Sequence, residues 1–414
     1  MKILIWDMFE LHNTGGPSGY VYNIHSYLTQ NPNPNIFFLS KEISVQSSNN
    51  KPVINNKYDD PPKRNILKWS WHSLLKTVNH TPYIKSFLTK TLDYTYRIYR
   101  IKWDNLKNRI NVDEYDYIHF HFLIHIIQFR NTFPNYRGKT ILTSHSPCPW
   151  TDELIDADKS LRFLRYFLYR KECKLYNCAD YLMFPCPQAK EPYEHNKIIK
   201  ATLDRLNDRT FYTPTSILTV SNKTVHNLSR QDYNIPESAF IIAYFGRHNK
   251  IKGFDIFRDI VSKALEAHPN LYVLCAGSGE ISSLRHPRWI ELGFVSNVKD
   301  IMTLCDLYVL PNRETYFDLV VIEALRAGLV LNVSLTGGNK FFKTLPSSET
   351  KGIYYFDINN LNQALNNISS LYELKENRPE EFKKLKRNNN ALFHNHFTIN
   401  KYIDFYLKNI QLLN

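Results

Sequence analysis

The sequence predicts two doubly wound α/β domains, each built on a parallel sheet. Short apolar runs alternate with longer helical segments along the whole chain, a pattern typical of parallel α/β layers. A length of 414 residues is long for a single core, so two domains are the natural expectation. The polar stretch 231–238, interrupted by Pro236, is the best candidate linker. We therefore expect an N-terminal domain over 1–230, a C-terminal domain over 231–397 and a final helix over 398–414.

Each expected strand is a short apolar run that stops at a polar or glycine-containing loop, and each expected helix is longer. In the first domain we expect strands at Lys2–Trp6, Asn35–Leu39, Tyr115–Phe120, Lys139–Ser144, Asp180–Phe184 and Ser216–Val220, with helices near Ser18–Thr29, Leu67–Lys107 (broken) and Asp158–Tyr176. In the second domain we expect strands at Phe240–Phe245, Leu271–Cys275, Trp289–Leu292, Leu307–Leu310 and Leu329–Val333, with helices near Gly253–Ala267, Asn297–Leu304, Phe317–Ala327 and Asn360–Leu371.

Several features of the sequence favour a cytoplasmic location. The first apolar run is too short for a signal peptide, and no stretch approaches the roughly 20 apolar residues that span a bilayer. The six cysteines show neither framework spacing nor a Cys-x-x-Cys pair, which favours free thiols in a reducing compartment over disulfides or zinc.

The net charge of +13 is concentrated in the window 61–110, where eleven Lys or Arg residues stand against two Asp residues. Eight Trp, Tyr and Phe side chains are interleaved with these cations from Trp69 to Trp103. Cations with interfacial aromatics are attracted to an anionic membrane surface. The alternative is a solvated helical insertion whose aromatics pack inward. Nucleic acid is disfavoured as a partner, because no recognition-helix, RNP or zinc-finger pattern accompanies the charge.

The stretch 306–328 is the most informative for function. An apolar strand stops at Pro311, a short polar loop carries Glu314, and a helix that opens near Phe317 carries Glu323. Carboxylates accept hydrogen bonds from sugar hydroxyls, while the free amides and dipole of a helix N-terminus attract phosphate. This pairing suits a nucleotide sugar. The alternative is an ordinary strand-loop-helix unit with two solvated glutamates.

Two further loops have the composition of an anion site. Gly15 and Gly16 precede an amphipathic helix, and adjacent glycines let the backbone pass close to a bulky anion; a plain tight turn is the alternative. Arg247 and Lys252 straddle the loop that follows strand 240–245. Two cations together with helix amides can hold a diphosphate and stabilise the charge that grows on it as a leaving group.

Weaker signals come from two loops of the second domain. Gly277 follows a strand and permits close backbone approach. The main chain around Phe294 and Val295 could read the edge of a base through its exposed N–H and C=O groups.

Three histidines lie at or just past strand ends of the first domain. Alternation points His119 and His121 to one face, where packing or substrate contact is favoured over a metal site, because no carboxylate stands at suitable spacing. His145 lies in a polar loop after a strand and is the better candidate for touching a sugar.

Taken in order, these loops resemble those of GT-B glycosyltransferases of family 4, a large retaining group that uses nucleotide-sugar donors. The resemblance covers nearly the whole chain and is strongest over 245–328. The family's Gly-Arg-x-x-x-x-Lys-Gly loop matches Gly246, Arg247, Lys252 and Gly253, which implies that Arg247 and Lys252 contact the donor diphosphate. Further matches imply contacts to the base at Gly293, Phe294 and Val295 and hydrogen bonds to the ribose at Glu323. Gly15 and Gly16 match the glycine pair beside the phosphates, and His145 matches the family's catalytic-site histidine. The final helix, Thr398–Leu413, resembles the helix that crosses back onto the first domain.

The chain departs from the family pattern at two places. Glu314 and Glu323 are separated by eight residues, whereas the family's motif has seven. When Phe317-Asp318 is aligned with the family's Phe-Gly, Thr315 takes the place of the first acid, and the resemblance implies donor contacts at Phe317, Asp318 and Leu319. Either a bulge presents Glu314, or Thr315 and main-chain amides hold the donor sugar. The second departure is Lys340, which stands where a glutamate is common.

The resemblance implies a retaining transfer of a sugar from a nucleotide sugar to a glycan or lipid-linked acceptor, without metal or other cofactor. The basic window 61–110 suggests peripheral attachment at the inner face of a bacterial membrane, in the synthesis of surface polysaccharide or a glycoconjugate. Two alternatives remain open: a nucleotide-sugar epimerase on the same scaffold, and a non-catalytic subunit that binds nucleotide or glycan for a partner.

Overall fold

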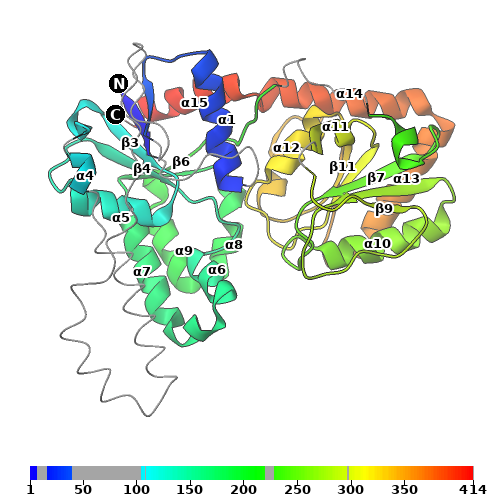
Figure 1. The fold of residues 1–414 in the computed structure, drawn as a ribbon, viewed down its shortest axis with the longest axis horizontal. Coiled ribbons are helices and arrows are strands. Elements are labelled where there is room, and N and C mark those ends of the chain that lie inside the picture. The colour runs from blue at the N-terminus through cyan, green and yellow to red at the C-terminus, as the bar shows by residue number, and fades with distance from the viewer. Residues whose placement is uncertain (7–15, 40–103, 108, 220–227, 296–297, 414) are drawn as a thin grey trace. The chain divides into compact units, whose positions relative to one another are not determined.

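The computed structural model describes residues 1–6, 16–39, 104–107, 109–219, 228–295 and 298–413 (Figure 1). The chain divides into two compact units. The first comprises Met1–His12, Leu28–Phe184 and Tyr193–Phe211, and the second comprises Asn13–Tyr27, Pro185–Pro192 and Tyr212–Asn414. Nearly all of the predicted insertion at 61–110 lies outside the described residues, as does Gly15. The domain boundary near residue 231 stays a prediction.

The first sheet has the strand order β2-β1-β3-β4-β5-β6. The ladders that join β2, β1, β3, β4 and β5 are all parallel. All four residues of β1 are buried, because a central strand of a doubly covered sheet has no face to water. The strands are β1 (Ile3–Trp6), β2 (Ile36–Leu39), β3 (Tyr117–Phe120), β4 (Lys139–Thr143), β5 (Tyr181–Phe184) and β6 (Thr210–Tyr212).

Helices connect the strands of the first sheet in the alternating manner of parallel α/β folds. The helix α7 packs against α6 and α9. The helices up to the second sheet are α1 (Gly16–Gln30), α4 (Asp104–Lys107), α5 (Leu123–Thr132), α6 (Trp150–Ala157), α7 (Arg165–Asn177), α8 (Glu191–Glu194) and α9 (Lys197–Arg205), with short 3₁₀ segments at η1 (Val112–Glu114), η2 (Lys159–Leu164), η3 (Pro187–Lys190), η4 (Asn207–Arg209) and η5 (Arg230–Tyr233).

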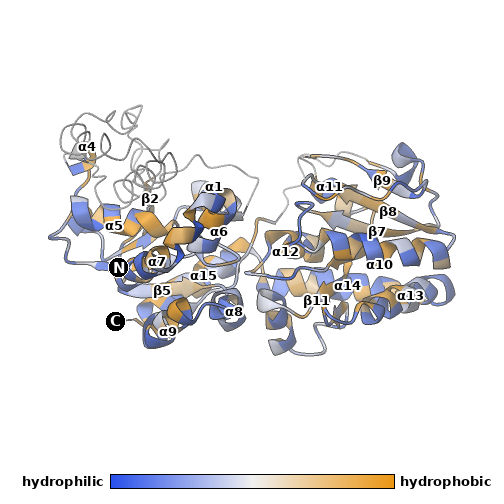
Figure 2. Ribbon diagram, turned by 90° about the horizontal axis from the view of Figure 1, so that it is seen from below, coloured by the Kyte–Doolittle hydropathy of each residue, from blue (hydrophilic) through white to orange (hydrophobic). Residues whose placement is uncertain are grey.

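The second sheet is parallel throughout, with the order β12-β11-β10-β7-β8-β9. The central strands β7 and β10 are fully buried and apolar, and Figure 2 colours the ribbon by the hydropathy of each residue. The direction of winding reverses between β7 and β10, which makes their carboxyl ends the switch point of a doubly wound sheet. The strands are β7 (Phe240–Phe245), β8 (Leu271–Ala276), β9 (Trp289–Glu291), β10 (Leu307–Leu310), β11 (Val330–Ser334) and β12 (Ile353–Phe356).

The helices of the second half cover this sheet and build its core. Phe254, Phe257 and Val261 of α10 pack with Val273 of β8 and Ile368 of α13 in one apolar cluster. The segments are α10 (Phe254–Ala267), α11 (Val298–Met302), α12 (Leu319–Arg326), η6 (Gly337–Thr344), α13 (Leu361–Asn377), α14 (Pro379–His396) and α15 (Ile399–Gln411). Among the helices of the described residues, none combines the length and apolar character needed to cross a membrane.

The predicted fold class, with two parallel doubly wound sheets, is confirmed, but one predicted strand is wrong. Over the described part of Ser216–Val220 there is only an isolated bridge between Ile217 and Thr398. The sixth strand is instead β6, which begins at Thr210, seven residues before Ile217. The apolar run near Ile217 is buried against the segment that leads into α15, and burial alone made it look like a strand.

Candidate functional site

The loops that follow β7 and β10 meet at the switch point of the second sheet. Gly253 has a φ of +64°, and a Cβ atom there would lie 1.8 Å from the carbonyl oxygen of Pro311. The amide of Arg313 donates a hydrogen bond to the carbonyl of Ile251, at 2.9 Å. Only a glycine at 253 lets the two backbones come this close. The close contact and the hydrogen bond hold the two loops together at the edge where doubly wound sheets bind ligands.

The two predicted diphosphate cations lie in the β7 loop but differ in their surroundings. The Arg247 side chain is exposed, and within the described residues it has no ion-pair partner. The Lys252 side chain is partly buried, and its Nζ lies 2.7 Å from Oδ1 of Asp318. The side-chain amide of Asn312 donates a hydrogen bond from Nδ2 to Oδ2 of Asp318, at 2.5 Å. The charge of Lys252 is therefore already neutralised by a carboxylate that is itself held in place.

Asp318 also stands at the position before the first residue of α12. Its side chain makes no capping hydrogen bond to the helix amides, yet its negative charge lies where the helix dipole favours an anion. A phosphate bound at this helix start would use the same dipole and the same lysine. Asp318 thus pairs with the lysine and the helix start that such a phosphate would need.

Glu323 is on α12, five residues after Asp318, and it is partly buried. Burial raises the pKa of the Glu323 carboxyl, and the nearby Arg326 opposes this shift only in part. Within the part of the chain that the structure describes, no hydrogen bond to the Glu323 carboxylate is found. A desolvated acceptor of this kind is suited to the hydroxyl donors of a ribose.

Thr315 and Glu314, the two candidates for the first acid position, lie in different environments. Thr315 is fully buried, and its Oγ1 lies 3.2 Å from Oγ1 of Thr336. Its carbonyl accepts a hydrogen bond from the amide of Gly338, at 3.0 Å. Glu314 is only partly buried. The hydroxyl of Thr315 is thus engaged inside the protein.

The remaining residues of this loop divide between core and helix. Phe317 is buried among Phe341, Phe342 and Phe397, with ring centres 5.6–6.3 Å away. This packing makes Phe317 part of the core beneath the loop. Leu319 is partly exposed as the first residue of α12.

Three glycine loops stack beside the switch point. Gly277 has a φ of +140°, and a Cβ atom there would lie 1.8 Å from the carbonyl oxygen of Gly246. Its amide donates to the carbonyl of Gly293, at 2.8 Å. Phe294 follows with 78% of its side chain exposed, and Val295 is partly buried. The structure therefore brings the predicted base loop next to the predicted diphosphate loop.

The histidines predicted from strand ends form one cluster in the first unit. Nδ1 of His121 lies 2.9 Å from Nε2 of His145, and Nε2 of His119 lies 2.8 Å from Oγ1 of Thr143. The rings of His119 and His121 lie 4.1 Å apart, as their shared face predicts. Burial lowers the pKa of His119 and of His145 to about 3. A hydrogen bond between two imidazoles needs one acceptor nitrogen, so at least one of the two rings is neutral. Burial also lowers the pKa of His121, which favours the neutral form of both rings near pH 7.

Two more residues that the sequence singled out, Gly16 and Lys340, are placed by the structure. Gly16 begins α1, and a Cβ atom there would meet no atom within 4 Å, so the space beside it is open. Lys340, predicted as a departure from the family pattern, forms an ion pair with Glu191 at the start of α8. Lys340 and Glu191 are both partly buried, and the two opposite charges neutralise each other.

One group among the described residues could in principle hold a metal ion: His248, Cys275 and Glu291, whose ligand atoms all lie within 4.8 Å of one another. The Sγ of Cys275 lies 3.6 Å from Nε2 of His248, a hydrogen-bonding distance for sulfur. Nε2 of His248 is 3.9 Å from the nearer oxygen of Glu291, and Ser283 and Trp289 donate to the other oxygen. We assign no ion to this group.

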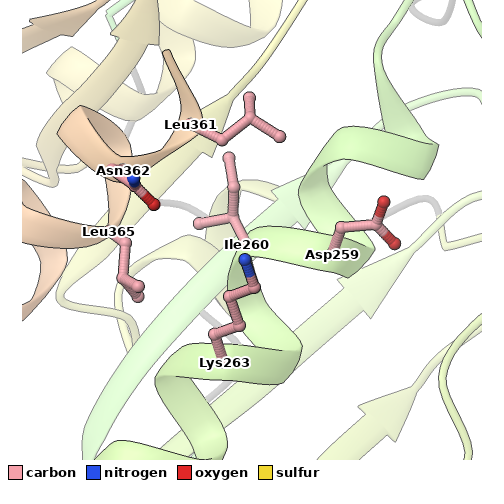
Figure 3. A pocket seen from close by; sticks show the side chains of 6 residues that line it. All are labelled: Asp259, Ile260, Lys263, Leu361, Asn362 and Leu365. Carbon is pink, nitrogen blue, oxygen red and sulfur yellow. The ribbon is translucent and has the colours of Figure 1, made fainter.

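A shallow pocket between α10 and α13 lies apart from these loops (Figure 3). Its lining consists of Asp259, Ile260 and Lys263 from α10 and Leu361, Asn362 and Leu365 from α13. It contains none of the predicted site residues.

Sequence reasoning missed the partners that position Lys252. It predicted Asp318 as a donor-binding residue, aligned with a family glycine, but not as a partner of Lys252, and it did not identify Asn312. The sequence does show an acid at the start of a predicted helix, but nothing in the spacing identifies Lys252, 66 residues away, as its partner.

Comparisons with known proteins bear on the family and the fold of this chain. Residues 239–372 match a family model described as "Glycosyl transferases group 1". An uncharacterised glycosyltransferase of Methanocaldococcus jannaschii, MJ1607, is 28% identical over 142 residues, which are 31% of this chain and 35% of that protein. The chain therefore matches about a third of that relative's length.

Solved structures match over the whole chain at low identity. Sucrose-phosphate synthase from Thermosynechococcus elongatus has a TM-score of 0.61 and 16% identity, covering 100% of this chain and 99% of that one. Anabaena HepE in complex with UDP and glucose has a TM-score of 0.57 and 14% identity, covering 99% of both chains. A glycosyltransferase from Rickettsia africae has a TM-score of 0.56 and 13% identity, covering 98% and 97%. The predicted GT-B fold is thereby confirmed, whereas retention of configuration and membership of family 4 stay predictions.

Proposed function

We propose that this chain, with a GT-B fold and a segment that matches the group 1 glycosyl transferases, transfers a sugar from a nucleotide-sugar donor to an acceptor hydroxyl. The observation that carries the proposal is the convergence of Arg247, Lys252 and the start of α12 at the switch point between β7 and β10. HepE, a similar fold, is solved with UDP and with UDP-glucose, which supports a uridine nucleotide as the first donor to test.

Donor binding begins with an exchange of anions. The diphosphate binds at the start of α12 and replaces Asp318 as the ion-pair partner of Lys252. The exposed Arg247 provides a second cation. The ribose hydroxyls donate to the buried carboxylate of Glu323. The exposed backbone around Phe294 lies beside the base.

The proposed reaction breaks the bond between the anomeric carbon and the diphosphate oxygen and forms a bond from that carbon to the acceptor oxygen. The acceptor attacks from the face that the diphosphate leaves, so configuration is retained. The proton of the acceptor passes to the departing phosphate oxygen. Arg247 and Lys252 stabilise the charge that develops on that leaving group, and the route uses neither a protein nucleophile nor a metal.

Of the two candidates for the first acid position, we assign Glu314 to the donor sugar. The Thr315 hydroxyl is buried against Thr336, whereas Glu314 is partly exposed in the same loop. Neutral His145 can accept or donate a hydrogen bond to a sugar hydroxyl, but its lowered pKa makes it a poor general acid. We further propose a glycan or lipid-linked acceptor, in the synthesis of bacterial surface polysaccharide or a glycoconjugate.

The experiment is a screen of the full chain against uridine, guanosine and adenosine diphosphate sugars, with thermal stabilisation and release of free nucleoside diphosphate as readouts. We expect one donor to stabilise the chain and to be hydrolysed slowly without acceptor. NMR of the donor alone separates transfer from epimerisation, because an epimerase changes the sugar and releases no nucleotide. Stabilisation without turnover, with any acceptor tried, would instead support a non-catalytic binding subunit.

A further inference from the structure

A cluster of exposed aromatic side chains marks one surface of the first unit. Of the six large apolar side chains that are exposed among the described residues, three lie within five consecutive positions. These are Phe163 at 91%, Tyr166 at 63% and Phe167 at 39% exposure. Phe163 is in η2, and the other two are in the first turn of α7. Such clustering is unusual for a surface that faces only water.

The opposite face of α7 explains why these residues point outward. Leu168, Cys173 and Leu175 are buried, and α7 packs on α6 and α9 through this inner face. The helix is therefore already anchored, and its aromatic outer side is not needed for the core. We name the outer surface the α7 patch, consisting of Arg162, Phe163, Tyr166, Phe167, Arg170 and Lys171.

The α7 patch contains three cations and no acid. From Lys159 to Asn177 the sequence contains six Lys or Arg residues and one acid, Glu172. Glu172 is fully buried, and burial raises its pKa to about 7 although the amides of Trp150 and Thr151 donate to it. Lys159 and Arg165 are paired with Asp156 and Asp152 of α6, so the charge of the patch comes from Arg162, Arg170 and Lys171.

Cations and aromatics of the patch are interleaved, not segregated. The guanidinium of Arg170 lies 5.6 Å from the ring centre of Tyr166, and Nζ of Lys171 lies 4.9 Å from that of Phe167. Each pair is spaced by four residues, which places the two side chains on one side of the helix. An aromatic ring inserts at the level of lipid headgroups while a neighbouring cation meets their phosphates.

We propose that the α7 patch docks this chain on an anionic lipid surface. Charge complementarity favours an anionic surface, because the patch has three cations and no acid, and aromatic rings beside cations are typical of the headgroup level of a membrane. The protruding Phe163 also suits a deformable headgroup layer better than a preformed pocket. The inference is separate from the proposed reaction, since donor turnover can be measured in solution.

The test is co-sedimentation of the full chain with vesicles of phosphatidylcholine alone or mixed with phosphatidylglycerol. We expect binding only to the mixed vesicles, weakening with added salt. R162Q/R170Q/K171Q removes three cations; at about 1 kcal/mol for each cation near the surface, the partition coefficient should fall roughly a hundredfold. F163S/Y166S/F167S should abolish the salt-resistant part of binding. If the triple variant does not fold, F163S alone is used, and it should reduce the salt-resistant part of binding.

Matched controls come from the C-terminal helices. K383Q/K384Q/R387Q removes three exposed cations of α14, and F405S removes a side chain of α15 that is 56% exposed. Both should bind vesicles as the unaltered chain does, and donor hydrolysis in solution should be the same in all variants. Failure of the unaltered chain to bind mixed vesicles would overturn the proposal, as would equal loss of binding in the controls. So would a change from dimer to monomer in F163S/Y166S/F167S by light scattering, which would assign the patch to a second copy.

Discussion

Nζ of Lys252 lies 2.7 Å from Oδ1 of Asp318, at the start of α12. The pair joins the two loops of the switch point and neutralises one of the two cations proposed to hold the donor diphosphate. A ligand anion must therefore compete with a built-in carboxylate for the same lysine and the same helix dipole. This relationship leads to the first prediction.

Asp318→Asn should strengthen binding of a nucleoside diphosphate at least roughly fivefold, because an ion pair of about 1 kcal/mol no longer has to be broken. Asparagine keeps an acceptor for the amide of Asn312, so the loop should stay in place. Titration calorimetry measures the effect, with Asp259→Asn on the exposed side of α10 as the matched control. Weaker binding in Asp318→Asn would show that the carboxylate supports the ligand rather than competing with it.

Glu323→Gln should separate ligand binding from stability. Loss of a charged acceptor should weaken binding of the nucleoside diphosphate about 10- to 100-fold. The fold should become no less stable, because burial raises the pKa of Glu323 and the charged form is costly in the folded chain. Thermal unfolding with and without nucleotide checks both parts. A large drop in Tm without nucleotide would assign Glu323 a structural role.

Much of the fold was predictable because its strands are buried on both faces. The predicted bounds of β7 and β10 agree with the structure at both ends, since each is a continuous apolar run that stops at a glycine or proline. The strand β12 was missed, because its four residues Ile353–Phe356 form the short edge of the sheet. Ser216–Val220 was wrong because an apolar run buried against another segment has the same pattern as a strand.

The site was predictable as a set of loops but not as a set of partners. Glycines at 246 and 277 and the cations Arg247 and Lys252 follow strands, and the sheet order brings their loops together. No local pattern shows that Lys252 pairs with Asp318, or that His121 bonds to His145. Such contacts depend on how separate loops fold against one another, and this information is not contained in spacing along the chain.

The histidine cluster should make the fold sensitive to acid. Burial lowers the pKa of His119, His125 and His145 to about 3, whereas a histidine of the unfolded chain titrates near 6.5. Between these values the unfolded chain binds more protons, so the free energy of unfolding decreases as the pH falls from about 6.5 toward 3. Urea unfolding followed from neutral to mildly acidic pH measures this slope.

His145→Gln should reduce the acid sensitivity, since glutamine can still bond to His121 and does not titrate. His394→Gln on the surface of α14 is the control and should leave the slope unchanged. A stability that does not depend on pH across this window would contradict the buried, neutral cluster.

Gly277→Ala should damage the base and diphosphate loops together. Its φ of +140° and the 1.8 Å approach of the Gly246 carbonyl leave no space for a methyl group, so we expect a loss of more than about 2 kcal/mol in stability. Gly246→Ala is the matched control, because its Cβ would make only ordinary contact with Tyr244, at 3.7 Å. Chemical denaturation compares the two, and equal stability would show that the stacked loops can move apart.

The central claim is that Arg247 stabilises the departing diphosphate, and the rate of donor turnover in Arg247→Ala tests it most directly. Lys250→Ala is the matched control, because Lys250 is an exposed cation of the same loop. We predict that kcat/KM falls at least about 100-fold in Arg247→Ala with an unchanged Tm, and stays within a few-fold of the original in Lys250→Ala. Equal rates in the two variants would contradict the account.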